Sequence, residues 1–259
     1  HHRLGEDQAS DRLVYEEKDT GMFAGIDISG SERFVIVDVH NHDTSEVRLI
    51  DAAAPESPPR LIAPREAGIE YEVEHWGDML IIKTNRDGAE DYKIVTAPLA
   101  RPEPGNWLDL VPHRPGVFIV GMAVFKRWLV RMERENALPR LVVREMATGE
   151  EHTIAFAEEA YSLGFGEMRE FETDTLRFTY SSPTTPAQVF DYDMKTRTRV
   201  LRKTQEVPSG HDPSHYVTRR IFAPAHDGET VPVRLGPAGL FIGDQAVATE
   251  RRPANALLN

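Results

Sequence analysis

An internal repeat of about 47 residues constrains the fold of this chain more than any other feature of its sequence. Four apolar runs that suit β-strands recur with starts 45, 49 and 48 residues apart: 33–37, 78–82, 127–131 and 175–179. A second set of runs recurs with starts 46, 48 and 48 residues apart: 45–49, 91–95, 139–143 and 187–191. Because two independent markers keep nearly the same period and offset, the chain is built from repeated units of one kind.

Each repeat has room for about four short strands. In the third repeat they are predicted at Val117–Val124, Trp128–Glu133, Arg140–Glu145 and His152–Phe156. The stretch Ala147–Glu150 suits a hairpin turn, because Gly149 can adopt the positive φ that such turns need. The second strands are apolar on both faces, as expected of strands with a sheet on each side. Helical periodicity is weak, since the best candidate, Ala155–Tyr161, is too short to form a core.

Four-stranded units repeated at this spacing predict an all-β fold, a partial β-propeller of about four four-stranded antiparallel blades plus an incomplete one. A β-sandwich with coincidental spacing is the alternative. The blades are expected at about 22–65, 70–114, 116–157 and 160–206. Leu13-Val14-Tyr15, within residues 1–16, is interpreted as the end of an earlier blade. An open piece of a propeller would expose two apolar blade faces, so self-association, ring closure with another chain or low stability is expected.

Composition excludes several classes of function. The chain has no cysteine, which rules out disulfides, thiolate zinc sites and cysteine nucleophiles. Its formal net charge of −12 argues against a nucleic-acid partner, which needs a basic face. No apolar run approaches the roughly 20 residues that span a bilayer, and His1–Gly5 has no signal-peptide apolar region. The absence of cysteine suits a reducing compartment, so a cytoplasmic location is expected. No cofactor is predicted.

A search for catalytic and metal-binding patterns yields weak candidates only. The sequence has no Gly-x-Ser-x-Gly motif, and the nearest stretch, Gly25–Gly30, favours Ser29 as a turn residue rather than a nucleophile. His40 and His42 flank a turn and lack a third metal ligand in the sequence. The stretch His211–His215 has the side chains of a triad but resembles a proline-containing linker.

Three further features favour structural roles. Asp191 and Asp193 share one strand face and could hold a cation or exchange protons, although a solvated outer strand beside Lys195, Arg197 and Arg199 is the favoured interpretation. Gly164-Phe165-Gly166 is expected to be a loop, without the strand–loop–helix context of a phosphate site. The tryptophans are expected to contribute to the core or to the packing of the blades: Trp76, Trp107 and Trp128. No catalytic, cofactor-binding or metal-binding residue is therefore predicted.

Short stretches throughout the chain resemble oligopeptidase B (protease II) of the prolyl oligopeptidase family, over residues 2 to about 233. They lie at 2–5, 13–17, 44–48, 63–66, 112–115, 133–141, 147–152, 180–186, 205–210 and 220–223. The resemblance implies a seven-bladed propeller that caps an α/β-hydrolase domain. It also implies a serine peptidase that cleaves short peptides after basic residues, with the propeller restricting the access of substrates.

The resemblance also divides the chain. Residues 1–206 are expected to form the partial propeller, and 207–233 a linker and the first hairpin of a hydrolase domain. Residues 234–259 form a tail that departs from the family pattern. The family's serine, aspartate and histidine have no counterparts here, so the chain alone should be inactive. Its expected partner is the absent hydrolase domain or a second copy of itself. An independent protein-interaction module and an inactive truncated remnant remain the alternatives.

Overall fold

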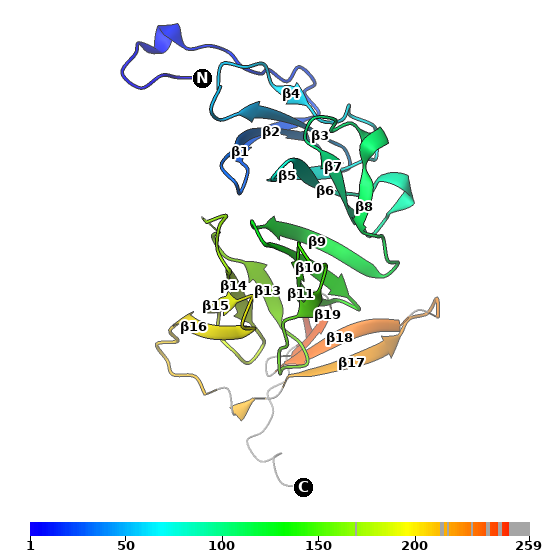
Figure 1. Cartoon of the computed structure of the whole chain (residues 1–259). Helices are drawn as coiled ribbons and strands as arrows, with labels where there is room; N and C mark the ends of the chain where they lie inside the picture. The colour runs from blue at the N-terminus through cyan, green and yellow to red at the C-terminus, as the bar shows by residue number, and fades with distance from the viewer. Residues whose placement is uncertain are drawn as a thin grey trace. The chain divides into compact units, whose positions relative to one another are not determined.

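The computed structural model describes residues 1–168, 170–212, 215–216, 218–228, 230–236, 239–242 and 245–248. Its strands belong to five four-stranded sheets in these residues, and the strand order in each sheet follows the chain (Figure 1). The chain forms two compact units: His1–Lys126 with Glu170–Glu172, and Arg127–Arg169 with Thr173–Asn259. Within the described residues, no helix is long and apolar enough to cross a membrane.

The first unit contains two complete sheets. The first sheet consists of β1 (Phe23–Ile28), β2 (Phe34–His40), β3 (Ser45–Asp51) and β4 (Arg60–Leu61). The second consists of β5 (Tyr71–Trp76), β6 (Met79–Thr84), β7 (Lys93–Pro98) and β8 (Leu108–Val111). All neighbouring strands in both sheets are antiparallel. The unit also holds β9 (Val117–Val124) and three short 3₁₀ helices: η1 (Gln8–Ser10), η2 (Arg86–Gly88) and η3 (Pro104–Asn106).

The second unit begins with β10 (Trp128–Glu135), β11 (Leu138–Glu145) and β12 (Glu151–Thr153), which pair antiparallel in this order. A complete sheet follows, made of β13 (Ser162–Phe165), β14 (Thr175–Ser181), β15 (Gln188–Asp193) and β16 (Thr198–Thr204). The last sheet contains β17 (Arg219–Pro224), β18 (Thr230–Gly236), β19 (Gly239–Ile242) and β20 (Gln245–Ala248).

The prediction of an all-β fold with four-stranded antiparallel blades is confirmed. In the third repeat the strand β9 has the predicted bounds, while β10 and β11 are two residues longer than predicted. Gly149 has a φ of 75° in the turn between β11 and β12, as its place in the sequence predicts. The segment Ala155–Tyr161 is not helical.

The assignment of residues 1–206, 207–233 and 234–259 to separate domains stays a prediction. The tail from residue 234 contains the end of β18 and the strands β19 and β20. Residues 249–259, which include the polar stretch at its end, lie outside the described residues.

One prediction about local structure is wrong. Gly164 lies in β13 and not in a loop, and it pairs with Thr179 of β14. A Cβ atom on Gly164 would lie 2.7 Å from the Thr179 Oγ1 atom, and one on Gly166 would lie 2.5 Å from the Arg177 Cγ atom. The two glycines therefore mark the close approach of the side chains of a neighbouring strand, a role that glycine has in sheets.

The core of the first unit lies between its two sheets. Buried side chains of β2 and β3 pack against those of β5, β6 and β7, and they include Phe34, Ile36, Leu49, Leu80 and Ile82. Leu80 and Ile82 have no exposed surface. This packing explains why β2 and β6 are apolar on both faces, because side chains on both faces of these strands are buried, whereas β14 alternates buried and exposed positions.

The opposite face of the first sheet packs against residues that precede β1. Val37, Val39 and Ile50 form a cluster there, and Val14 and Tyr15 pack against it. Residues 11–19 belong to no strand, and Val14 and Tyr15 cover this face of the sheet while Leu13 is 74% exposed.

The strand β1 on this face is exposed along its whole length. Ile26 and Ile28 pair with Val37 and Val35, so they extend the same face, yet Ile26 is 77% exposed. The expectation of self-association, which such an apolar surface favours, stays a prediction.

Candidate functional site

Polar side chains gather at one end of the blades. We call this the exit end: the end at which the second strand of a blade finishes, the third begins, and the chain leaves for the next sheet. In the first sheet it comprises residues 40–45 and the connection 62–70. In the sheet of β13 to β16 it comprises residues 181–188 and the connection that leads to β17.

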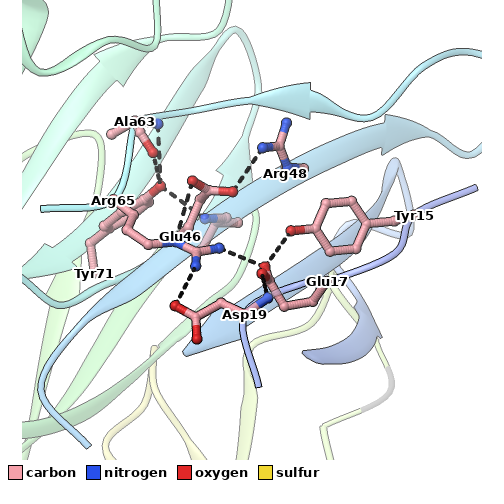
Figure 2. Close-up of polar contacts among 9 residues, drawn as sticks. Tyr15, Glu17, Asp19, Glu46, Arg48, Ala63, Arg65 and Tyr71 are labelled. Carbon is pink, nitrogen blue, oxygen red and sulfur yellow. Dashed lines mark hydrogen bonds and ion pairs between the residues drawn. The ribbon is translucent and has the colours of Figure 1, made fainter. Parts of the chain in front are cut away.

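Arg65 is the centre of an ionic network at the exit end of the first sheet (Figure 2). Its guanidinium group lies 2.6 Å from Glu17 Oε2, 3.8 Å from Glu46 Oε2 and 4.0 Å from Asp19 Oδ2. Arg48 binds the other oxygen of Glu46 at 2.8 Å. The network joins the segment before β1 to β3 and to the connection after β4, three parts of the chain that are far apart in sequence.

Glu17 is the best-satisfied carboxylate of this network. It accepts hydrogen bonds from the Arg65 guanidinium, from the Asp19 amide at 2.8 Å and from the Tyr15 hydroxyl at 2.8 Å. These donors, Arg65 first, lower the pKa of Glu17 to about 2. Arg48 also lies over the ring of Tyr15, 5.3 Å from its centroid. The segment that covers the first sheet is thus held by both charge and aromatic contact.

Tyr71 connects the same end to the second sheet. Its buried hydroxyl donates to the Ala63 carbonyl at 2.6 Å and accepts from the Val47 amide at 2.8 Å (Figure 2). Burial raises the pKa of Tyr71 to about 12. Ser45 donates to the Tyr71 carbonyl at 2.9 Å and accepts from its amide at 2.6 Å. A serine whose hydroxyl is engaged in both directions is not prepared to act as a nucleophile.

A polar pocket of about 230 Å³ opens beside Tyr71. Its lining residues are Asp38, His40, Asn41, Ser45, Glu70, Tyr71, Glu72, Lys83 and Tyr92. The carboxylates in it are paired: Glu72 with the Lys83 ammonium at 2.7 Å, and Glu70 with the Tyr92 hydroxyl at 2.7 Å. Burial and the bond to Glu70 raise the pKa of Tyr92. The pocket is thus lined by polar and charged groups that bind one another.

The second unit contains a buried ionic network near the exit end of β10 and β11. Glu133, which has no exposed surface, accepts from the Arg131 guanidinium at 2.6 Å and from the Arg140 guanidinium at 2.7 Å. Arg131 also binds both oxygens of Glu151, at 2.8 and 2.7 Å. The bonds from Arg131 lower the pKa of the Glu151 carboxyl, although burial opposes them. These charges join β10, β11 and β12.

Glu158 accepts hydrogen bonds from several hydroxyl groups at the exit end of the sheet of β13 to β16. Its carboxylate accepts from Thr185 at 2.6 Å, Tyr180 at 2.8 Å and Thr184 at 2.9 Å. Hydrogen bonds from Ser182, Thr185, Thr184 and Tyr180 lower the pKa of Glu158 against the effect of burial. The connection between β12 and β13 is therefore fastened to the loop between β14 and β15.

Ser29 is a turn residue, as predicted. It lies in the turn between β1 and β2, is 1% exposed, and accepts a hydrogen bond from the Phe34 amide at 3.1 Å. Its own amide donates to the Phe34 carbonyl at 2.8 Å. His40 binds Asp38 at 2.6 Å, and the ring of His42 lies 6.4 Å from that of Phe23. In the described part of the chain, no three His, Asp or Glu side chains are placed to hold a metal ion.

The two aspartates of β15 have separate roles. The prediction of a solvated outer strand is wrong for Asp191, which is buried in β15 between β14 and β16 and binds Arg177 and Arg202, each at 2.7 Å. Asp193 caps the turn that follows, accepting from the amides of Lys195 and Thr196.

Of the histidine and aspartate residues in the linker, His211, Asp212 and His215 lie in the described part of the chain. His211 binds the Thr184 carbonyl at 2.7 Å, and His215 lies 3.6 Å from Asp212. Pro213 and Ser214 lie outside the described residues.

Two of the three tryptophans lie in or against a core, as predicted. Trp128 is 5% exposed, and its indole N–H donates to Asp174 at 2.7 Å. Trp107 packs against the core of the first unit, and Trp76 donates to the Lys126 carbonyl at 2.9 Å.

Sequence reasoning singled out none of the charged residues that form these networks. A signal was nevertheless present, because several stretches that resemble the family supply their members. Residues 13–17, 44–48 and 63–66 meet around Arg65, and 133–141 supplies Glu133 and Arg140. Residues 180–186 surround Glu158. A charged residue inside a family-like stretch, next to a strand end, is the pattern that points to them.

The family profile described as "Prolyl oligopeptidase, N-terminal beta-propeller domain" matches residues 1–205. Among curated relatives, dipeptidyl aminopeptidase BI of Pseudoxanthomonas mexicana is 43% identical over 90% of this chain and 32% of its own length. Protease 2 of Moraxella lacunata is 31% identical over 93% of this chain and 36% of its own length. The chain thus spans about a third of the length of these relatives.

Solved structures agree with the sequence comparison. Oligopeptidase B from Trypanosoma brucei, in a closed form with covalently bound antipain, matches 95% of this chain and 36% of its own with a TM-score of 0.82 and 28% identity. Oligopeptidase B from Leishmania major matches 90% of this chain and 34% of its own with a TM-score of 0.82 and 29% identity. The antiparallel four-stranded sheets, the family profile and these structures lead to one conclusion: the chain belongs to the prolyl oligopeptidase family and contains part of its N-terminal β-propeller domain.

Proposed function

We propose that this chain is the propeller portion of a serine peptidase that cleaves short peptides after basic residues, and that it restricts the access of substrates to an active site on another domain. The observation that carries the proposal is the likeness to oligopeptidase B structures over nine tenths or more of the chain. The fit extends beyond the profile match, which ends at residue 205, because the T. brucei enzyme aligns with 95% of the chain.

The polar networks support a scaffolding role. The hydroxyls of Ser29 and Ser45 are held by main-chain groups, and Glu17, Glu133 and Glu158 are bound by several donors each. Groups held in this way fix loops in position, and they leave the bond-breaking chemistry to another domain. In the proposed enzyme the exit end supplies a rigid rim for that domain.

The proposal is tested by joining this chain to the hydrolase domain of Leishmania major oligopeptidase B. The joined protein is expected to hydrolyse a short peptide at arginine, and to prefer it over a matched peptide with leucine at that position. The 259-residue chain alone is expected to leave both peptides intact, because its sequence has no nucleophile motif. Hydrolysis by the purified chain alone, or a folded joined protein without activity, would contradict the proposal.

A further inference from the structure

A segment formed by His211 and residues 218–220 contacts the β14–β15 loop and the connection between β12 and β13 in the second unit. His211 Nε2 lies 2.7 Å from the Thr184 carbonyl, and Thr218 donates to the Thr184 hydroxyl at 3.4 Å. Arg219 donates to Glu159 Oε1 at 2.7 Å, and the Arg220 amide donates to Glu159 Oε2 at 3.0 Å. These contacts place β17 on the connection between β12 and β13.

In these hydrogen bonds the donors lie on the segment and the acceptors lie on the blades. In the contacts made by the described residues of the segment, the blades present acceptors: the Glu159 carboxylate, the Asn136 carbonyl, and the carbonyl and hydroxyl oxygens of Thr184. The segment supplies the donors, including the Arg220 guanidinium that binds the Asn136 carbonyl. His211 must carry its proton on Nε2 here, because a carbonyl oxygen only accepts. We call these oxygens of Asn136, Glu159 and Thr184 the acceptor surface.

Glu158 and Glu159 bind different parts of the chain. The Glu158 carboxylate accepts from hydroxyls of the β14–β15 loop, whereas the Glu159 carboxylate accepts from the first residues of β17. The two Glu159 oxygens then bind consecutive residues, one through a guanidinium and one through a main-chain amide. The hydrogen bond from the Arg220 main-chain N–H holds the start of β17 against Glu159, and the ion pair with Arg219 holds the preceding residue there as well. Both bonds lower the pKa of Glu159, the Arg220 amide most.

We infer that the acceptor surface is the docking site for the part of the protein that begins at β17, and that Glu159 is the residue that positions it. The partner it fits is a donor-rich strand with two consecutive arginines. That the docked part is the start of a peptidase domain rests on the proposed function, whereas the docking itself does not.

Hydrogen exchange of the 259-residue chain, followed by mass spectrometry, tests the inference. In Glu159→Ala the peptide covering 219–224 is expected to exchange about 3- to 10-fold faster, since the pair is half-exposed and one bond is to the main chain. Peptides of β14 should keep their wild-type rates. The matched control is Glu150→Ala, which removes another exposed ion pair, with Arg197, and should leave 219–224 unchanged.

A conservative variant separates positioning from general stability. Glu159→Gln keeps an acceptor for the Arg220 amide but loses the charge, so its exchange over 219–224 should lie between wild type and Glu159→Ala. Unchanged exchange over 219–224 in Glu159→Ala, or an equal acceleration in β14, would overturn the inference. Because exchange does not depend on peptide cleavage, an inactive joined protein would refute the proposed function and leave this result standing.

Discussion

Glu133→Gln is expected to destabilise the second unit by about 3–5 kcal/mol, the usual cost of removing one partner from a buried ion pair. Glu133 has no exposed surface, and Arg131 beside it is 4% exposed. The substitution keeps the shape of the side chain and removes its charge. Among the described residues, Arg131 then keeps Glu151 as a charged partner, and Arg140 keeps Glu135. Both arginines lose a charged partner in a place that water reaches poorly.

Urea unfolding followed by circular dichroism measures this loss. Glu150→Gln is the matched control, because Glu150 is 63% exposed and pairs with the exposed Arg197, so its loss should cost less than about 1 kcal/mol. A Glu133→Gln variant as stable as the control would show that solvent or rearrangement compensates the buried charges.

Phe178→Ala is expected to cost about 3–5 kcal/mol, as large-to-small changes at buried aromatic positions do. Phe178 lies in β14 without exposed surface, stacked on Phe190 with ring centroids 5.4 Å apart. The ring of Phe156, which precedes β13, meets it edge-on at 5.7 Å. Removing Phe178 leaves a cavity between the connection after β12 and the sheet of β13 to β16.

The same unfolding experiment tests this prediction, with Phe178→Leu as its control. Leucine keeps much of the apolar volume and should cost clearly less than alanine. If leucine and alanine cost the same, the aromatic contacts and not the filled volume would determine the stability of this region. A loss below about 1 kcal/mol for alanine would mean that the site collapses around the smaller side chain.

The fold was predictable because its signal is local and repeated. The runs at β2, β6, β10 and β14 carry apolar residues at a steady spacing, and β14 alternates buried and exposed positions as a strand should. The loop assigned to Gly164 failed for a physical reason, because the side chain that requires glycine there belongs to Thr179, 15 residues later.

The candidate site was not predictable in the same way. Arg65 binds Glu17, which is 48 residues away in the sequence, and Arg219 binds Glu159, which is 60 residues away. No local pattern pairs such residues, because their meeting depends on how connections cross the exit end of each blade. Resemblance to the family marked the stretches that contain many of them. The structure was needed to show which charged side chain in each stretch has a partner, and which partner that is.

Size selection is the most direct test of the central claim, that this chain limits which substrates reach a peptidase active site. The measurement compares cleavage of a short arginine peptide with cleavage of the same sequence placed inside an unfolded protein, using this chain joined to the Leishmania major hydrolase domain. The hydrolase domain without the propeller serves as the reference. The account predicts that the joined protein cleaves the peptide and spares the protein, in contrast to the reference. Comparable cleavage of both substrates by a folded joined protein would contradict it.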